Sequence, residues 1–206
     1  MDFLYPLKRL WYKKQLKNER FRFLFDEPPA GEYVSIDCET TGLDTKKDEI
    51  LSIGAVRIKN NTLLTSESLH LWVRPEGTIS AESIKVHHLR HCDLQDAMPL
   101  SEALERLLYF IGSRPLVGYY LEFDTAMIGR VVKPLLGISL PNPQIEVSAL
   151  YHDYKVEPIP QGFIDLRFDT ILKDLGLPLL GKHSALNDAV MAALIFMKLT
   201  QLKKGA

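Results

Sequence analysis

Three strand-like segments that follow one another with short connections constrain the fold of this chain more than any other feature. Tyr33–Cys38 and Ile50–Ile58 are apolar runs, and Leu63–Val73 alternates roughly between apolar and polar residues. The connections at Thr41–Lys47 and Lys59–Thr62 are short and rich in turn-forming residues. Because consecutive strands with short links usually pair as neighbours, this pattern predicts an antiparallel meander.

Helical periodicity dominates the rest of the chain. The spacing of apolar residues predicts helices over Ser80–His88, Leu100–Ile111, Thr125–Leu136, Asp165–Leu175 and Ser184–Leu202. Short apolar segments at Pro115–Tyr119 and Gln144–Ser148 could add strands to the meander. Strands first, and then strands mixed with helices, predict an α/β fold in which helices flank a mixed sheet.

The first 30 residues differ from the body of the chain in charge. Residues 1–22 contain seven Lys or Arg and two acids, whereas the remainder has 18 bases and 24 acids. Apolar residues recur in this segment at helical spacing, at Phe3, Leu4, Leu7, Leu10 and Trp11, which predicts an amphipathic helix over about the first 22 residues. The breaker-rich segment Asp26–Gly31 follows. We therefore predict a basic amphipathic N-terminal arm with a Pro-rich linker over residues 1–30, and a main domain over residues 31–206.

The partner of this arm stays open at the level of sequence. Its apolar stripe could pack on the body, dock a protein partner, or touch nucleic acid or anionic lipid. The chain has no run of about 18 apolar residues, so no membrane span is expected. Cys38 and Cys92 make no disulfide framework, which favours a reducing cytoplasm.

The first candidate site is the motif D-x-E at Asp37 and Glu39. Residues two apart on a strand share a face, so both carboxylates point one way while Ile36 and Cys38 point the other. Two carboxylates about 4 Å apart repel by on the order of 4 kcal/mol at an effective dielectric of 20. A divalent cation would remove that cost, and oxygen ligands suit Mg²⁺ or Mn²⁺. A solvent-exposed pair at a strand end is the alternative.

Two further motifs carry acids at the beginnings of predicted helices. Asp124 follows the apolar strand that ends at Gly118, and the helix dipole alone would favour a carboxylate there. In the third motif, Ser184 is a plausible N-cap, with His183 just outside the helix and Asp188 one turn inside it. An acid on such an apolar helix needs a partner, and histidine suits a general base near neutral pH.

Together, the order D-x-E, D and H-x4-D resembles the DEDDh exonucleases, typified by the proofreading epsilon subunit of bacterial DNA polymerase III. The resemblance covers about residues 32–202 and includes the flanking segments Leu51–Val56 and Ile84–His87. A sister group carries tyrosine in a Y-x3-D motif, where this chain has Ser184, so the histidine variant is indicated.

The resemblance implies an RNase H-like mixed sheet, with an antiparallel meander plus parallel strands, and a 3′–5′ exonuclease domain over residues 31–206. It also implies two divalent cations, Mg²⁺ or Mn²⁺, that hydrolyse the terminal phosphodiester and release nucleoside 5′-monophosphates. Asp37 would bridge both cations, and Glu39 and Asp188 would complete the site that holds the attacking water. Asp124 would support the second cation, and His183 would deprotonate the water.

Substrate contacts are expected around these motifs. They comprise the stretch after the first motif and the residues around the second and third: Thr40, Thr41, Gly42, Leu43, Tyr119, Tyr120, Phe123 and His183. The nucleic acid 3′ end would be DNA rather than RNA, since the first motif is closer to the DNA proofreading branch. The alternatives are an RNA or short-oligonucleotide exonuclease of the same fold and a non-catalytic module that binds nucleic acid or a partner.

The chain departs from its relatives at two places. Relatives commonly carry His-Asn where this chain has Tyr119 and Tyr120, which puts substrate contacts there in doubt. They often carry glycine in the middle segment, where this chain has His88. His87 and His91 lie four residues apart and could suggest zinc, but no second ligand pair has a fitting spacing.

Overall fold

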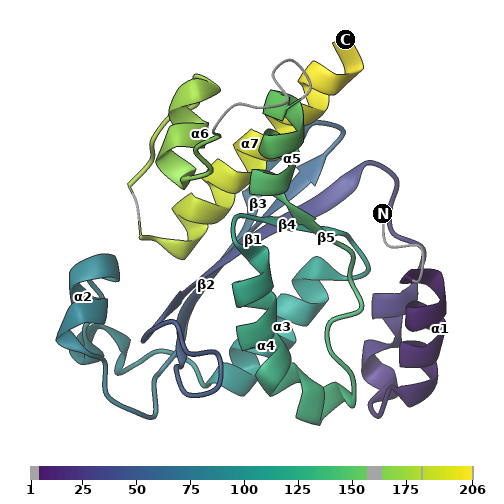
Figure 1. Ribbon diagram of the computed structural model, residues 1–206. Coiled ribbons are helices and arrows are strands. Elements are labelled where there is room, and N and C mark those ends of the chain that lie inside the picture. Colours follow the sequence, from purple (N-terminus) through teal and green to yellow (C-terminus); the bar gives the residue numbers. More distant parts are fainter. Residues whose placement is uncertain (1–4, 157–163, 182, 206) are drawn as a thin grey trace.

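One mixed five-stranded sheet organises the molecule. The computed structural model describes residues 5–156, 164–181 and 183–205. The strands are β1 (Glu32–Thr40), β2 (Ile50–Lys59), β3 (Thr62–Trp72), β4 (Leu116–Gly118) and β5 (Gln144–Glu146). Their order is β3-β2-β1-β4-β5 (Figure 1). The pairs β1–β2 and β2–β3 are antiparallel and the pairs β1–β4 and β4–β5 are parallel, as the sequence predicts.

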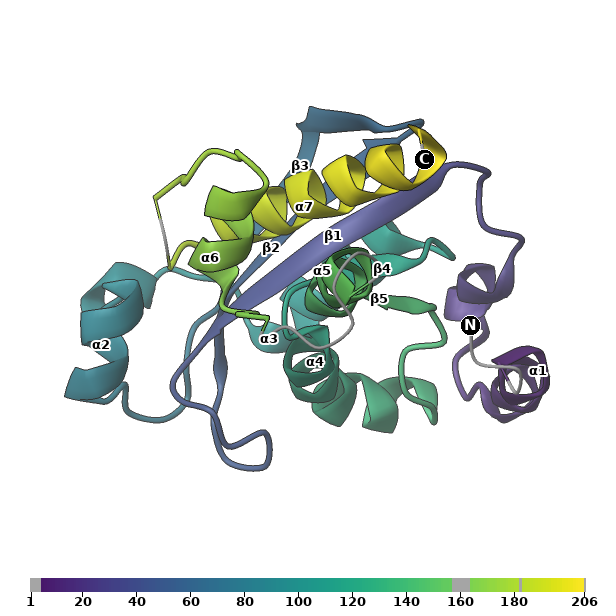
Figure 2. The ribbon, with the colours of Figure 1, turned by 45° about the horizontal axis from the view of Figure 1, so that its top comes forward.

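Helices cover both faces of this sheet (Figure 2). One face packs against the 3₁₀ segment η1 (Glu19–Phe25) and the helices α3 (Leu100–Ile111) and α4 (Leu121–Leu136). The other packs against α5 (Val147–Val156), α6 (Phe168–Asp174) and α7 (Ala185–Gly205). Helix α2 (Ala81–His87) and the 3₁₀ turn η2 (His91–Leu94) follow β3 at one side of the molecule, and α1 (Tyr5–Gln15) lies at the opposite side.

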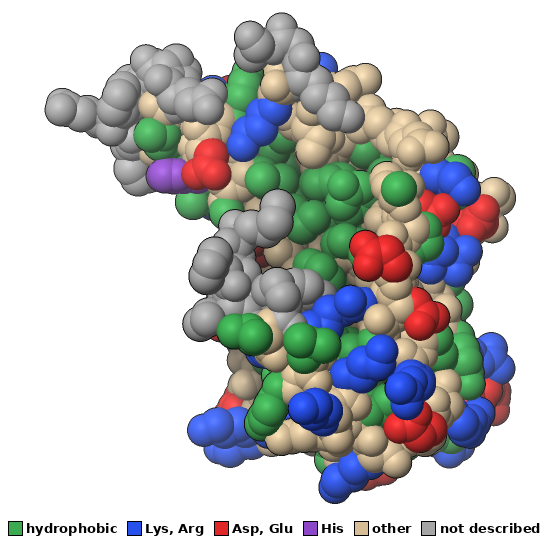
Figure 3. All heavy atoms as spheres, turned by 90° about the vertical axis from the view of Figure 1, so that its right-hand side faces the viewer, with side chains coloured by type: hydrophobic (Ala, Val, Ile, Leu, Met, Phe, Trp, Pro, Cys, Tyr) green, Lys and Arg blue, Asp and Glu red, His purple; other side chains and the backbone are tan. Residues whose placement is uncertain are grey.

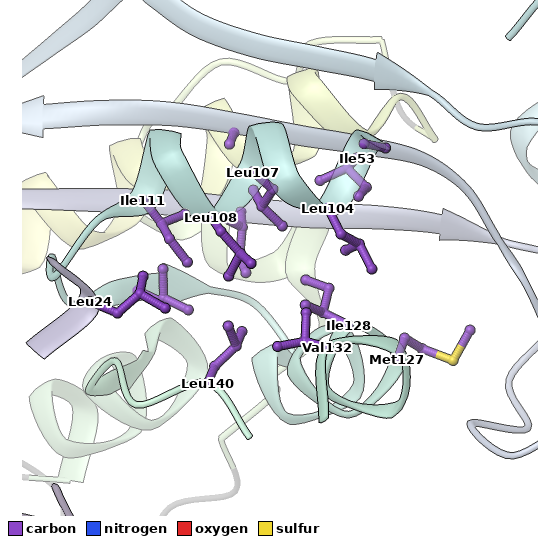
Figure 4. Close-up of a cluster of buried hydrophobic side chains, with 14 of the residues drawn as sticks. Leu24, Ile53, Leu104, Leu107, Leu108, Ile111, Met127, Ile128, Val132 and Leu140 are labelled. Carbon is purple, nitrogen blue, oxygen red and sulfur yellow. The ribbon is translucent and has the colours of Figure 1, made fainter. Parts of the chain in front are cut away.

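Alternation along β1 divides the two faces. Ile36 and Cys38 are buried in the core under α3 and α4, so Asp37 and Glu39 lie on the α7 face. In that core, apolar side chains of α3 meet those of α4 (Figure 4). A fully buried aliphatic side chain contributes about 1.5–3 kcal/mol, so the acidic end of β1 rests on a rigid layer.

Helix α7 lies directly on β2 at Gly54. A Cβ atom at this position would come within 2.1 Å of the Ala185 carbonyl carbon and 2.2 Å of the Leu186 nitrogen, both in backbone. Gly54 pairs with Asp37 across the sheet, so the first turn of α7 reaches the row that carries the first carboxylate. The absence of a side chain at Gly54 therefore sets the position of the α7 N-terminus.

The N-terminal segment is more broken than the sequence pattern indicates. The predicted helix over the first 22 residues is wrong beyond Gln15, where α1 ends. Leu16 is buried and the Lys17 N–H donates to the carbonyl of Leu136 at 2.8 Å, which draws the backbone out of the helix. The following η1 buries three apolar side chains in the main core, those of Phe21, Leu24 and Phe25. The division of the chain at residue 30 stays a prediction.

Other elements confirm the predicted helices with small shifts. α3 has the predicted bounds, whereas α4 begins four residues before the predicted Thr125. The sequence did not predict α5, which follows β5 directly. His88 ends α2 with φ 60°, a left-handed conformation that glycine adopts at no steric cost, which accounts for the glycine that relatives often carry there.

Within the described residues, one helix is long and apolar enough to cross a membrane, α7 over Ala185–Lys203. Several of its apolar side chains are buried against the sheet, α5 and α6, and its first turn carries the acidic Asp188. These contacts are those of a core helix.

Gly54→Ala should disrupt the close packing of α7 on β2. The new methyl group meets backbone rather than a flexible side chain, so we expect a loss of about 1–3 kcal/mol or more in the free energy of unfolding. Urea denaturation of both proteins measures it. Gly129→Ala is the matched control, since a Cβ there has nothing within 4 Å and alanine favours the helix by about 0.5–1 kcal/mol. Equal stability of the Gly54 variant and the parent would contradict the packing at Gly54.

Candidate active site

Three carboxylates from distant parts of the chain meet at one end of the sheet. Asp37 and Glu39 come from β1, and Asp188 comes from the first turn of α7. One carboxylate oxygen of each lies within 4.8 Å of the others. Glu39 is buried and the other two are half-buried, so the group opens to solvent on one side. The structure thus brings together the acids of the first and third motifs, whose convergence the resemblance implies.

The chain leading into α7 fixes Asp188. The backbone N–H of His183 donates to Asp188 Oδ2 at 3.1 Å, and the Asp188 N–H donates to the Ser184 carbonyl at 2.9 Å. His183 itself takes a left-handed conformation with φ 58°, and its side chain is exposed. The histidine therefore lies beside the carboxylate to which its backbone is bonded, with its imidazole accessible to solvent.

Asp124 lies outside this group of three, on the opposite face of β1. It lies in the first turn of α4, is buried, and accepts a hydrogen bond from the Cys38 N–H at 2.9 Å. Cys38 stands between Asp37 and Glu39, so this bond ties the fourth carboxylate to the strand that carries the first two. The predicted helix entry is confirmed, and the bond to Cys38 is a contact that the sequence did not indicate.

Burial and mutual repulsion disfavour the charged forms of these groups. Burial raises the pKa of Glu39 to about 7, with a further contribution from the charge of Asp188. Burial also raises the pKa of Asp124 to about 8, against the opposing effect of the Cys38 hydrogen bond. The pKa of Asp37 is raised well above its ordinary value by burial and by the charges of Asp124 and Asp188. Metal-free protein would therefore hold protons here near neutral pH.

Divalent cations fit this donor set. The grouped atoms are hard carboxylate oxygens, and no Lys or Arg forms a described salt bridge to Asp37, Glu39 or Asp124. Oxygen-only ligands suit Mg²⁺ and Mn²⁺ better than softer metals. Cations would offset the repulsion that otherwise raises the pKa of each acid. Negative charge at Asp37, Glu39 and Asp124 without a described basic partner supports a metal-binding role for these carboxylates.

The loop after β1 is tightly cross-linked and presents one apolar side chain. The Asp48 carboxylate accepts from the Thr41 hydroxyl at 3.0 Å and from the Asp44 N–H at 2.7 Å. A Cβ on Gly42 would lie 2.6 Å from Asp48 Oδ2, so this position favours glycine. Leu43 is 82% exposed at the tip, and the Thr40 hydroxyl donates to the Gly42 carbonyl at 2.7 Å. The loop backbone is therefore fixed by internal hydrogen bonds, while the Leu43 side chain at its tip is exposed to solvent.

Helix α2 braces the end of β1 through a short hydrogen-bond chain. The Leu89 N–H donates to His87 Nδ1 at 3.0 Å, so in the neutral ring Nε2 carries the proton and donates to the Ser83 hydroxyl at 2.6 Å. That hydroxyl donates to the Thr40 carbonyl at 3.0 Å. Both ring nitrogens of His87 are thus engaged, which favours a structural role over zinc binding with His91. Burial lowers the pKa of His87, and nearby His88 and His183 lower it further.

The two tyrosines of the second motif have different surroundings. Tyr119 donates its hydroxyl to the Leu166 carbonyl at 3.0 Å and packs on Phe168 with ring centroids 4.6 Å apart. Tyr120 is 67% exposed and stacks on Phe123 at 6.2 Å with an interplanar angle of 10°. Tyr120 also has φ 54°, an uncommon conformation for a bulky residue. Of the two tyrosines, Tyr120 is the one whose ring is open to solvent.

Comparison with known families and proteins finds matches that cover most of the chain. The RNase_T family model, described as "Exonuclease", matches residues 34–196. The DNA polymerase III subunit epsilon of Aquifex aeolicus is 29% identical over 171 residues, which cover 83% of this chain and 81% of that protein. The PolC-type DNA polymerase III of Thermotoga maritima is 28% identical over 188 residues, 89% of this chain but 13% of that protein. This chain thus spans a small part of the PolC-type relatives.

Solved structures show the same fold. A zinc-bound complex of E. coli exonuclease I with single-stranded DNA has a TM-score of 0.70 at 14% identity, covering 86% of this chain and 42% of that one. Exonuclease X in complex with 5′ overhanging duplex DNA has a TM-score of 0.66 at 19% identity, covering 84% and 93%. These likenesses confirm the RNase H-like mixed sheet.

The stability of metal-free protein should fall as the pH rises. Folded-state pKa values of about 7 for Glu39 and about 8 for Asp124 exceed the ordinary values of about 4, so the folded state binds more protons between those limits. We expect the Tm in EDTA to decrease between pH 5 and 8, and the Tm gain from Mn²⁺ to increase over the same range. Thermal unfolding in both conditions measures this. A Tm in EDTA that rises toward pH 8 would contradict the assigned pKa directions.

Proposed function

The chain belongs to the RNase_T exonuclease family, and from that membership we propose that it removes nucleotides one at a time from the 3′ end of DNA. The observation that carries the proposal is the convergence of Asp37, Glu39 and Asp188 within 4.8 Å, with Asp124 bonded to the same strand. A complete acidic set supports catalysis over the alternative of a non-catalytic binding module, which has no need of four acids whose charged forms are disfavoured.

The four acids would hold two divalent cations, Mg²⁺ or Mn²⁺. The charges of Asp124, Asp188 and Glu39 all raise the pKa of Asp37, which suits a ligand shared by both ions. Glu39 and Asp188 would hold one ion with it, and Asp124 would support the other. When bound, such ions lower the pKa of an attacking water and stabilise a leaving 3′-oxygen.

His183 is the proposed general base. Its exposed imidazole can reach an incoming water and pass the proton to solvent, and its backbone bond to Asp188 holds it next to the cluster. A positioned histidine contributes about 10²–10⁴-fold to a proton-transfer step. In-line attack on the terminal phosphodiester would release a nucleoside 5′-monophosphate and leave a new 3′-hydroxyl.

DNA is the proposed substrate class. The epsilon subunit and the PolC-type polymerases to which the chain is similar are named as parts of DNA polymerase III, and two structural neighbours are described with single-stranded DNA or 5′ overhanging duplex DNA. RNA or short oligonucleotides are the alternative, since a set of carboxylates would not by itself distinguish RNA from DNA. The free cysteines Cys38 and Cys92 support a cytoplasmic location.

The terminal nucleotide would lie between two exposed surfaces. Leu43, on the loop formed with Thr40, Thr41 and Gly42, offers an apolar side chain to the last base. Tyr120, stacked on Phe123 just before the first turn of α4, offers an exposed aromatic face. Tyr119 has its hydroxyl and ring engaged within the protein, so of the two tyrosines Tyr120 is the proposed stacking partner.

Asp188→Asn should abolish the shortening of a 5′-labelled single-stranded DNA in Mn²⁺. Loss of one ligand removes several kcal/mol of transition-state stabilisation, which corresponds to a fall of about 10³-fold or more in rate. Asp153→Asn, on an exposed position of α5, is the matched control and should keep the parental ladder. Parallel lanes with mismatched duplex and RNA rank the substrates. An unchanged ladder from the Asp188 variant would overturn the proposal, and faster RNA cleavage would replace DNA with RNA.

Tyr120→Ala should weaken substrate binding while leaving the chemistry intact. Stacking contributes about 1–3 kcal/mol per base, so we expect KM for single-stranded DNA to rise by about tenfold. Hydrolysis of the small diester bis(p-nitrophenyl) phosphate should change little, because it carries no base that could stack on Tyr120. Tyr119→Phe, which removes the hydroxyl bond to Leu166, is the control and should leave the KM for DNA unchanged. A parental KM in the Tyr120 variant would exclude the stacking role.

A further inference from the structure

Helix α1 carries an apolar face that nothing in the described structure covers. Leu7 is 65% exposed, Leu10 is 61% exposed and Trp11 is 55% exposed. Residues three and four apart share one side of a helix, so these three side chains form one outward surface. Phe3 and Leu4, which continue the spacing in the sequence, lie outside the described residues. Exposed leucines are common one at a time, but three together with a tryptophan indicate a contact surface.

The inner face of the same helix is anchored to the body. Tyr12 packs against the main core, and Leu16 just after the helix is buried. Arg9 donates through Nη2 to the Asp26 carbonyl at 2.6 Å, and the Lys17 N–H donates to the Leu136 carbonyl. The outward face is therefore presented in a fixed orientation. Turning it inward would break these contacts.

Lysines surround this apolar face. Lys8, Lys13 and Lys14 form no ion pair among the described residues, and Lys8 lies over the Tyr12 ring at 5.6 Å. The nearby arginines Arg20 and Arg22 are paired with Glu105 and Glu19, so the unpaired charge belongs to the lysines. In the view toward α1, basic side chains gather around exposed hydrophobic ones in the lower half, with few acids between them (Figure 3).

The position of α1 separates it from the catalytic cluster. Both ribbon views place α1 at the side of the molecule opposite α2 and the N-terminal end of α7 (Figures 1 and 2). A nucleic acid strand end bound at the acidic cluster would not contact this helix. The apolar side chains of Leu7, Leu10 and Trp11 also offer no hydrogen bond or charge to a phosphate. A second copy of the chain is disfavoured as well, since a symmetric contact would bring like-charged lysines together.

We propose that the outward face of α1 docks this protein on an anionic lipid surface. Leucine and tryptophan would enter the boundary between head groups and acyl chains, while Lys8, Lys13 and Lys14 remain at the level of the negative head groups. This composition, with an apolar stripe, interfacial tryptophan and flanking lysines, is that of a helix that lies in the membrane plane. The site would face away from the membrane and stay open to a strand end.

The sequence has two tryptophans, Trp11 and Trp72, which makes the test direct. In a Trp72→Phe background, Trp11 is the sole tryptophan and its emission reports on α1. Vesicles of phosphatidylcholine alone are compared with vesicles of two parts phosphatidylcholine to one part phosphatidylglycerol. We expect a blue shift of the emission and co-sedimentation with the anionic vesicles, and neither with the neutral ones.

Two sets of variants separate the contributions. Lys13→Gln with Lys14→Gln should weaken binding by about 25-fold, from about fivefold per lysine near an anionic surface. Leu7→Ser with Leu10→Ser should weaken it by about tenfold or more and abolish the blue shift. Lys198→Gln with Lys203→Gln changes the net charge equally at exposed positions of α7 and should retain binding. Circular dichroism and the DNA ladder verify that the variants keep fold and activity, so failure here leaves the catalytic proposal untouched.

Other outcomes overturn the lipid proposal. Absence of binding to anionic vesicles excludes it, as does binding that the Leu7 and Leu10 variant leaves unchanged. Loss of affinity for a long single-stranded DNA on changing Lys13 and Lys14, without vesicle binding, would assign the face to nucleic acid. Sedimentation as a dimer that depends on Leu10 would assign it to a second copy.

Discussion

The contact between α7 and β2 at Gly54 determines where the chemistry can occur. The backbone of Ala185 and Leu186 lies so close to this glycine that no side chain fits between helix and strand. Because Gly54 is paired with Asp37, the close approach brings the first turn of α7 into the row of the first carboxylate. Asp188 and His183 are then carried to the end of β1 by a helix whose remaining length packs in the second core cluster. Core packing and site geometry therefore depend on the same missing side chain.

The acidic cluster imposes a second constraint. The repulsion among its carboxylates opposes the close packing that brings them together. Packing brings the carboxylates together, whereas burial and repulsion raise the pKa of Asp37, Glu39 and Asp124. Without cations, the carboxylates would bind protons and so lose their charge. With cations, coordination to the metal ions would neutralise the same charges. The Asp124–Cys38 hydrogen bond holds the fourth acid in place in either state. The site is thus preorganised by the backbone of β1 rather than assembled by its ligands.

Sequence reasoning predicted what depends on short-range pattern. Alternation in β1 placed Asp37 and Glu39 on one face, and apolar spacing gave α3 its observed bounds. It failed where contacts distant in sequence decide the backbone: α1 ends because Lys17 bonds to Leu136, and α4 begins early because Glu146 accepts from the Leu121 N–H next to the left-handed Tyr120. Asp124 was assigned through resemblance, since no local pattern reveals a bond to a residue 86 positions away.

Helix α7 contributes both to the active site and to the core, and this has a consequence for how the protein would lose activity on heating. Its first turn supplies Asp188, while the buried residues that follow, Ala189, Met191, Ala192, Ile195 and Leu199, belong to the core. The packing at Gly54 opposes fraying at this helix end. The site should therefore open only when the whole protein unfolds. Heat inactivation and loss of the native fold should therefore be one cooperative event, with no long-lived inactive form that keeps its core.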